Sequence, residues 1–305
     1  MPAFWRDHPW GLRAAALVLS ALLAATLQWV FPGAMVAVEQ VSGDLTWRLG
    51  AAATPERRIV IVDIDESSLE TVGPWPWPRE TIARLSDRLR AADVAVQVFD
   101  IVLDTPRAGD ALLGRAWAEH SVVAGQIFSI DARTTPKVAA VGGALASAGC
   151  PSFAPTSKGY IGNSRELLSD GLSVGHLTPM VESDGVVRKI PAVICHEGRA
   201  YPSLALAALW RAAQTGGPAP LTSDWVWSTH RFGGLFALSP AGWLSSASLP
   251  GMAVPVDDQG NLRVPYRLER KVFLSVPASQ VLNGSVDPAL LRGTIELEKV
   301  ELSGD

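Results

Sequence analysis

Apolar positions follow two different patterns along the chain, and the first is a continuous run near the N-terminus. Residues 14–31 read AAALVLSALLAATLQWVF. At 1.5 Å per residue, a helix of this length crosses the roughly 30 Å of hydrocarbon in a bilayer. Arginines precede the run and acids follow it, so we expect a cytoplasmic segment 1–13, a transmembrane helix 14–34 and an exported remainder. A cleaved signal peptide is the alternative, and it also exports the rest of the chain.

After this run, helical and strand periodicities alternate. Residues 35–58 keep apolar positions near a 3.6-residue spacing and then turn polar, which indicates a membrane-exit helix and a linker. Residues 59–64 (IVIVDI) are almost continuously apolar, as is typical of a strand buried on both faces of a parallel sheet. The next predicted elements are a helix, a strand, a helix and a strand at residues 79–92, 94–103, 108–120 and 121–128. This βαβαβ order predicts an α/β fold with a doubly wound, mainly parallel sheet.

Beyond residue 150 the predicted strands shorten and turn residues separate them, which indicates an added antiparallel hairpin region. The predicted strands are 159–163, 175–178, 186–195, 262–268, 272–276 and 294–297, with helices at 202–214 and 277–282. Residues 215–251 are rich in Gly, Pro, Ser and Trp and are too long for an ordinary connection, so we expect a surface insertion or a lid. Residues 59–305 are expected to form one exported domain.

Composition supports contact with lipid and argues against nucleic acid. Apolar residues make up 48% of the 305 residues and charged residues 18%, and the mean hydropathy is +0.20. The formal net charge is −4 and no basic block occurs, so we expect no nucleic-acid partner. The two cysteines, Cys150 and Cys195, lie in the exported part, where a disulfide is permitted. Their spacing leaves open a disulfide or two buried thiols, and it does not fit a zinc site.

Acidic residues gather where two predicted strands end. Asp63, Asp65 and Glu66 lie at the end of the first strand, and Asp100 follows the aromatic residue of the second. Ligands of doubly wound sheets bind outside the carboxyl ends of the strands. If the two strands are neighbours, Asp65 and Asp100 come close together and suit Mg²⁺, Ca²⁺ or a cationic group. The alternative is structural, because Asp is a good helix cap and Glu fits a first helical turn.

Two tryptophans follow these acids in the segment GPWPWPRE. Its prolines hold the backbone extended and place Trp75 and Trp77 on opposite sides. One interpretation is that a ring plugs the top of the sheet. The other is an aromatic wall of a pocket, with Arg79 beside it.

Several motifs occur in the order found in one known family. The chain reads RIVIVDIDESSLETVGPWPWPRE, then VAVQVFDIVLDTP, VESDGVVRKIPAVICHEGRAYPSLALAAL and VPVDDQGNLRVPYR. Over residues 47–293 it resembles the CHASE sensory domains of the second type, which are extracellular sensors found with cyclases and histidine kinases. The end of the chain, TIELEKVELSGD, departs from the valine-rich strand that the family has there. Whether residues 294–305 are native family sequence or a truncated end stays open.

The resemblance implies a membrane-anchored periplasmic sensor in the bacterial inner membrane. It would bind a small-molecule or periplasmic signal and pass it to a cyclase, diguanylate cyclase or kinase output outside these residues. A homodimer suits such transmission. In this interpretation the acids and arginines orient a polar ligand and the ring covers it. The pocket candidates are Asp65, Glu66, Trp77, Arg79, Asp100 and Arg188.

The alternative function is an exported metal-dependent hydrolase that uses Asp63, Asp65 and Asp100. The histidines offer no paired spacing for a metal: they are His8, His120, His176, His196 and His230. No GxSxG, HExxH or P-loop motif is present. We therefore expect a sensor without catalytic residues and without a resident cofactor.

Overall fold

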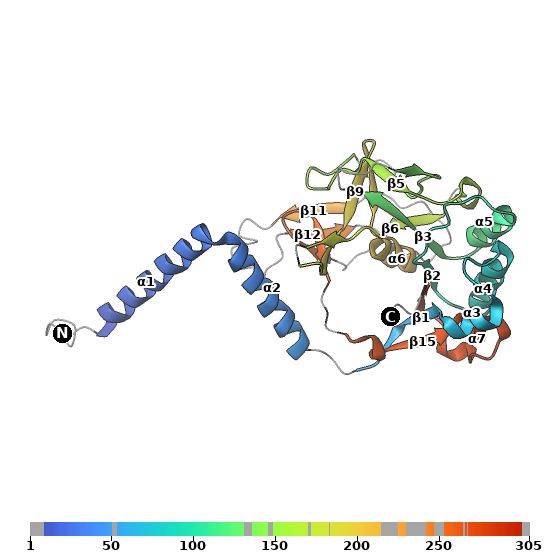
Figure 1. The fold of residues 1–305 in the computed structure, drawn as a ribbon, viewed down its shortest axis with the longest axis horizontal. Helices are drawn as coiled ribbons and strands as arrows, with labels where there is room; N and C mark the ends of the chain where they lie inside the picture. Colours follow the sequence, from blue (N-terminus) through green and yellow to red (C-terminus); the bar gives the residue numbers. More distant parts are fainter. Residues whose placement is uncertain are drawn as a thin grey trace. The chain divides into compact units, whose positions relative to one another are not determined.

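The computed structural model describes residues 9–50, 54–130, 136–145, 149–169, 172–182, 184–214, 225–229, 242–246, 253–264, 266 and 268–300 (Figure 1). The chain divides into two compact units. The first contains Met1–Ala52 with Tyr266–Leu268, and the second contains Ala53–Pro265 with Glu269–Asp305. His8, His230 and the last residues, 301–305, lie outside the described part.

The first unit contains two helices, and the break between them falls within the expected transmembrane segment 14–34. Helix α1 spans Pro9–Val30 and helix α2 spans Pro32–Leu49. The break falls at Phe31, because proline lacks an N–H group and disfavours helical geometry in the residue before it. Proline is well suited to the first position of the second helix. Among the described residues, no helix combines the length and the apolar character needed to cross a membrane. The structure therefore does not support the expected single helix at 14–34.

The second unit is built on a mainly parallel central sheet. Its order is β15-β1-β16-β2-β3-β5-β4, and β6 also pairs with β3. The β3–β5 pair is antiparallel and the others are parallel. The strands are β1 (Glu56–Ile64), β2 (Val96–Phe99), β3 (Val122–Ser129), β4 (Lys137–Val138), β5 (Gly159–Ile161), β6 (Ser173–His176), β15 (Phe273–Pro277) and β16 (Ile295–Val300). The expected mixed α/β fold with a mainly parallel sheet is confirmed.

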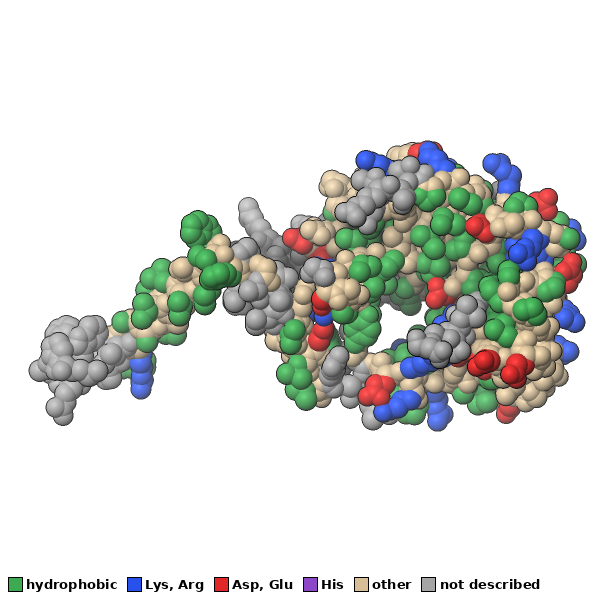
Figure 2. Space-filling view, in the orientation of Figure 1, with side chains coloured by type: hydrophobic (Ala, Val, Ile, Leu, Met, Phe, Trp, Pro, Cys, Tyr) green, Lys and Arg blue, Asp and Glu red, His purple; other side chains and the backbone are tan. Residues whose placement is uncertain are grey.

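Four helices cover one face of this sheet (Figure 1). They are α3 (Glu66–Val72), α4 (Arg79–Ala91), α5 (Asp110–Glu119) and α7 (Ala278–Asn283). Helix α4 buries Ile82, Leu85 and Leu89, which recur at helical spacing, and its arginines after the first turn are exposed to solvent. These side chains pack on Val60 and Val62 of β1 in the larger apolar core. Figure 2 shows charges of both signs interspersed over this helical side.

Helix α6 (Leu204–Ala213) packs on the opposite face, so the sheet has helices on both faces. Its apolar side meets Val96 and Val98 of β2 and Val123 of β3 in a second core. Small antiparallel sheets make up the rest of the unit, as expected: β10-β9, β11-β12-β13 and β14-β8-β7. Their strands are β7 (Met180–Val181), β8 (Val187–Pro191), β9 (Val193–His196), β10 (Arg199–Pro202), β11 (Trp225–Thr229), β12 (Gly242–Ser246), β13 (Ala253–Val256) and β14 (Asn261–Arg263).

The described parts of 215–251 are two strands, since β11 and β12 pair with each other and β12 pairs with β13, and the expected insertion or lid there stays a prediction. Two local expectations need correction. The predicted strand 186–195 is divided into β8 and β9, which belong to different sheets. The first two strands of the chain's parallel sheet are not neighbours, because β16 lies between β1 and β2. The last of these decides how the strand-end acids are arranged.

Candidate functional site

Asp65 caps a helix at the end of β1. Its carboxylate accepts a hydrogen bond from the Ser68 N–H (2.9 Å), and the Ser67 hydroxyl lies 3.0 Å from both of its oxygens. Partial burial acts to raise the pKa of Asp65, but the hydrogen bonds from Ser68 and Ser67 outweigh it and lower this pKa. Glu66 is exposed in the first turn of α3. Both residues therefore have the helix-start roles that the structural alternative gave them.

Asp63 is buried and bound to neighbouring side chains. One of its oxygens, Oδ2, accepts hydrogen bonds from Arg270 (2.9 Å) and from the Ser275 hydroxyl. Its other oxygen, Oδ1, is buried without a partner. The carboxylate thus anchors β15 and the turn before it to β1, which is a structural role.

Asp100 lies beyond the end of β2, on the far side of β16 from Asp65. Two inter-strand spacings, about 9–10 Å, therefore separate the backbones of the two strand ends. The residue is exposed, yet protein atoms around its carboxyl raise its pKa, while the positive charge of Lys299 acts to lower it. The expected side-by-side carboxylates do not form, because a third strand with a lysine separates them.

Trp77 and Arg79 lie in the core. Trp77 is 0% exposed, and its indole N–H donates to the Gly73 carbonyl (2.7 Å). Arg79 is 2% exposed and donates from Nε to Asp110 (2.6 Å) and from Nη2 to the Thr105 carbonyl (3.0 Å). Burial acts to raise the pKa of Asp110, but hydrogen bonds from Ser164 and Arg79 bring it below its ordinary value. The Trp77 ring packs in the apolar core on the sheet, and Arg79 forms a buried ion pair with Asp110.

Arg188 belongs to a different part of the unit, in the antiparallel sheet β14-β8-β7. Its side chain is buried and forms ion pairs with Glu182 and Asp184, each at 2.8 Å. These acids flank the turn that leads into β8. The six predicted pocket residues are thus distributed over a sheet edge, a buried core cluster and a separate hairpin, and any ligand-binding role for them stays a prediction.

A hollow of about 570 Å³ opens among α3, α4 and α7. Its polar lining comes from Thr71, Arg84, Asp87, Arg88, Ser279 and Asn283. Arg84 and Arg88 are exposed and stand one helical turn apart, so both guanidinium groups face the same space. Beside it, the Ser279 N–H donates to the Ser68 hydroxyl (3.0 Å) and fixes α7 to α3. The volume of the hollow lies in the range of small-molecule sites.

The arginines of this hollow were missed in the sequence because an amphipathic helix with charges on its outer side is typical of a solvated face. The available signal was the i, i+4 spacing of Arg84 and Arg88. That spacing alone does not show that α3 and α7 line a hollow together with the two arginines.

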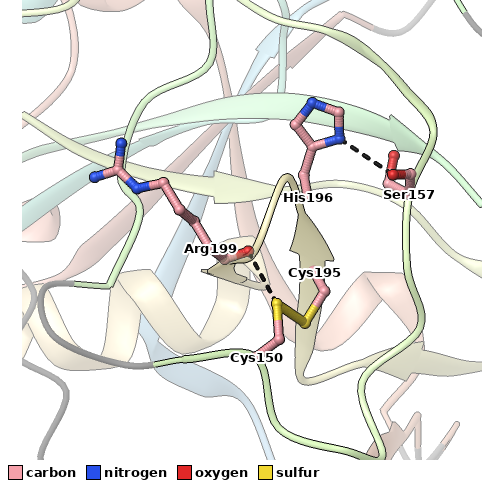
Figure 3. The surroundings of a disulfide bond; sticks show 5 residues. All are labelled: Cys150, Ser157, Cys195, His196 and Arg199. Carbon is pink, nitrogen blue, oxygen red and sulfur yellow. Dashed lines mark hydrogen bonds between the residues drawn. A yellow bond between two sulfur atoms is a disulfide. The ribbon is translucent and has the colours of Figure 1, made fainter.

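Figure 3 shows the disulfide between Cys150 and Cys195, which ties the segment before residue 151 to β9. The Cα atoms are 5.6 Å apart, within the usual range for this bond. Cys195 is buried and Cys150 is exposed. Next to Cys195, His196 Nδ1 lies 3.2 Å from the Ser157 carbonyl, so two neighbouring residues of β9 contact the segment that leads into β5.

Removal of this disulfide is expected to lower the free energy of unfolding by roughly 2–4 kcal/mol, because a 45-residue separation leaves a long loop free in the unfolded chain. The measurement is urea unfolding of Cys150→Ser with Cys195→Ala against the parent protein, with and without a phosphine reductant. The reductant should shift only the parent. An unchanged midpoint in the variant would contradict the prediction.

Neither the histidines nor the acids assemble a metal centre in the part of the chain that the structure describes. No group of three or more His, Cys, Asp or Glu side chains there is placed to hold a metal ion. His120, His176 and His196 are all buried: His120 faces Ser86, and the other two flank the Phe128 ring.

Comparison with known proteins gives one result. A family model described as CHASE2 domain matches residues 15–297, and no curated protein and no solved structure matches the chain. CHASE2 domains are extracellular sensory domains rather than catalytic ones. The match covers nearly the whole chain, including the central sheet and both of its helical faces. The chain therefore belongs to the CHASE2 domain family.

Proposed function

We propose that this chain senses a small extracellular ligand that binds in the hollow among α3, α4 and α7. Membership of a sensory family supports the class of function. The observation that carries the site is the hollow itself, which has the volume of a small-molecule pocket and a polar lining from three helices. Helices α3 and α7 directly follow β1 and β15, so a ligand that draws the helices together acts on neighbouring strands of the central sheet.

The lining favours an anionic ligand. Two exposed guanidinium groups, Arg84 and Arg88, bind carboxylate or phosphate oxygens in bidentate fashion. Ser279 and Thr71 add hydroxyl groups, and Asp87 supplies an acceptor for N–H donors of the ligand. A small carboxylate or phosphate compound, with or without an amino group, matches this set.

The test is a thermal-shift titration with citrate, glutamate and inorganic phosphate as separate probes. A probe at 100 times its Kd stabilises the folded protein by about 2.7 kcal/mol. Arg84→Ala with Arg88→Ala is expected to remove the shift. Arg90→Ala is the matched control, because Arg90 is exposed on the same helix but does not line the hollow.

A second arm of the same experiment examines the strand-end acids. Asp65, Glu66 and Asp100 remain candidates for a cation or a polar ligand because all three keep some exposure at the carboxyl edge of the sheet. Asp65→Asn with Asp100→Asn keeps a capping side chain at residue 65 and so preserves α3. If this pair removes a probe's shift while Arg84→Ala with Arg88→Ala retains it, the ligand site is at the sheet edge and the hollow is excluded.

We further propose that the sensory unit works in the periplasm as a homodimer attached to the membrane and acts on a cyclase or kinase output. The apolar run of residues 14–31 supports attachment, and the family supports signalling. Alkaline carbonate extraction of cell membranes is the direct check. Release of the full chain into the soluble fraction would exclude an integral anchor.

A further inference from the structure

Two glutamates of β16 lie in the middle of the apolar core. Glu296 and Glu298 are each 0% exposed, and all four of their carboxyl oxygens are buried without a hydrogen-bond partner. Buried polar groups in folded proteins almost always have partners, and an unpaired buried carboxylate is strongly unfavourable. Two such groups on one strand are an exception that needs a physical explanation.

The register of the sheet shows what surrounds them. Glu296 stands beside Val60 of β1 and Gln97 of β2, and Glu298 stands beside Val62 and Phe99. In a parallel sheet, residues in register point to the same face, which here is the face covered by α3, α4, α5 and α7. Both carboxyl groups therefore point into the larger apolar core.

No described cation on this face is available to neutralise them. The charged side chains on the covering helices are Glu66, Glu70, Glu80, Arg84, Asp87, Arg88, Arg90, Arg115 and Glu119, all exposed, and the buried pair of Arg79 with Asp110. Helix α7 carries no charged residue. Alternation along the strands places Asp63 and Lys299 on the opposite face of the sheet.

One further titratable group approaches through Gln97. Its side chain accepts a hydrogen bond from the Ser86 hydroxyl (2.6 Å), which lies 3.0 Å from His120 Nδ1. Burial lowers the pKa of His120, so the ring is neutral at pH 7 and supplies no charge. Burial raises the pKa of both glutamates well above the ordinary value, and the neighbouring Glu298 charge raises that of Glu296 further. The Val62 N–H acts weakly in the opposite direction on Glu296.

We propose that β16 occupies its position between β1 and β2 only while Glu296 and Glu298 both carry a proton, so that the central sheet is opened by alkaline pH. Ionisation releases the two protons to water and leaves two like charges in an apolar core, and the strand then leaves the sheet to hydrate them. Because β16 is an internal strand, its departure separates β15-β1 from β2-β3. This inference concerns the fold and does not depend on the proposed ligand site.

The direction of the pH effect follows from the protons bound. Above the ordinary carboxyl pKa of about 4.3, the unfolded chain has lost both protons while the folded chain keeps them. Stability is therefore complete below that value and falls as the pH rises toward the elevated pKa values of the folded state. With two protons involved, the folding equilibrium constant falls by up to about a hundredfold per pH unit.

The experiment combines urea unfolding with hydrogen exchange of the full chain between pH 7 and pH 9. The parent protein is expected to lose stability steeply, with faster exchange in peptides that cover Ile295–Val300. Glu296→Val with Glu298→Val is expected to remove the pH dependence, because valine suits a buried strand. All comparisons are made between proteins at the same pH, so that intrinsic exchange rates cancel.

Two further variants keep the test decisive. Glu296→Gln with Glu298→Gln keeps the shape and the unpaired polar groups but cannot ionise, so it should be less stable than the valine pair and equally flat with pH. Glu70→Gln removes an exposed carboxylate of α3 and should behave as the parent. A parent protein with pH-independent stability, or a valine pair that keeps the steep loss, would overturn the proposal.

Discussion

Replacement of Arg79 by alanine is expected to lower the free energy of unfolding by roughly 3–5 kcal/mol, because it leaves the Asp110 carboxylate buried without its partner. The pair joins α4 to the start of α5, and Arg79 also holds the Thr105 carbonyl of the connecting segment. Its loss therefore removes one partner of the buried Asp110 carboxylate and one partner of the Thr105 carbonyl. Urea unfolding followed by tryptophan fluorescence measures the change.

A double variant distinguishes the cost of leaving Asp110 without a charged partner from the cost of removing the Arg79 side chain. Arg79→Met with Asp110→Leu removes both charges and should recover most of the loss, since well-packed apolar residues replace a buried ion pair at little cost. Arg90→Ala, on the exposed side of the same helix, should change stability by less than about 0.5 kcal/mol. If Arg79→Ala is as mild as Arg90→Ala, the ion pair has no structural importance.

Acidification is expected to destabilise the domain through His176. Its ring is 1% exposed, and burial lowers its pKa to about 3, while the Pro191 backbone carbonyl acts to raise it. The folded protein thus keeps His176 neutral, while the unfolded chain binds a proton below the ordinary value of about 6.5. Stability falls by about 1.4 kcal/mol per pH unit from pH 6.5 down to the folded pKa, on the order of 4–5 kcal/mol in total.

The measurement is the difference in unfolding free energy between the parent and His176→Leu from pH 6.5 to pH 4.5. This difference should change by about 2.3 kcal/mol. The comparison uses a difference because ionisation of Glu296 and Glu298 changes the unfolding free energy in the opposite direction over this pH range. That contribution is the same in both proteins and cancels when one free energy is subtracted from the other. A difference that does not vary with pH would contradict the prediction, because it would show that His176 has the same pKa in the folded and unfolded states.

Local patterns predicted most elements because each depends on neighbouring residues. The apolar run at 59–64 became β1, the amphipathic segment 79–92 became α4, and the turn-rich region after residue 150 became antiparallel sheets. The order of strands in the sheet depends on contacts between distant residues. Nothing in the β1 or β2 sequences indicates that a strand from residues 295–300 lies between them.

The distances between the predicted pocket residues were hidden from the sequence for the same reason. The structural alternatives for Asp65 and Trp77 were visible locally, as a helix cap and a plug, and the structure has both. The partner of Arg79 was not visible, because Asp110 lies 31 residues further along. No role was assigned to Glu296 or Glu298 from the sequence, and only the sheet order shows that they lie inside.

The position of β1 also constrains how the chain folds as it is made. Its neighbours β15 and β16 are both synthesised much later, and the contact between Asp63 and Arg270 spans 207 residues. At about 5–20 residues per second, the nascent β1 waits tens of seconds for either neighbour. Through that interval β1 presents an unpaired apolar edge. The emerging chain therefore depends on chaperones or on slow, cooperative folding after its release from the ribosome.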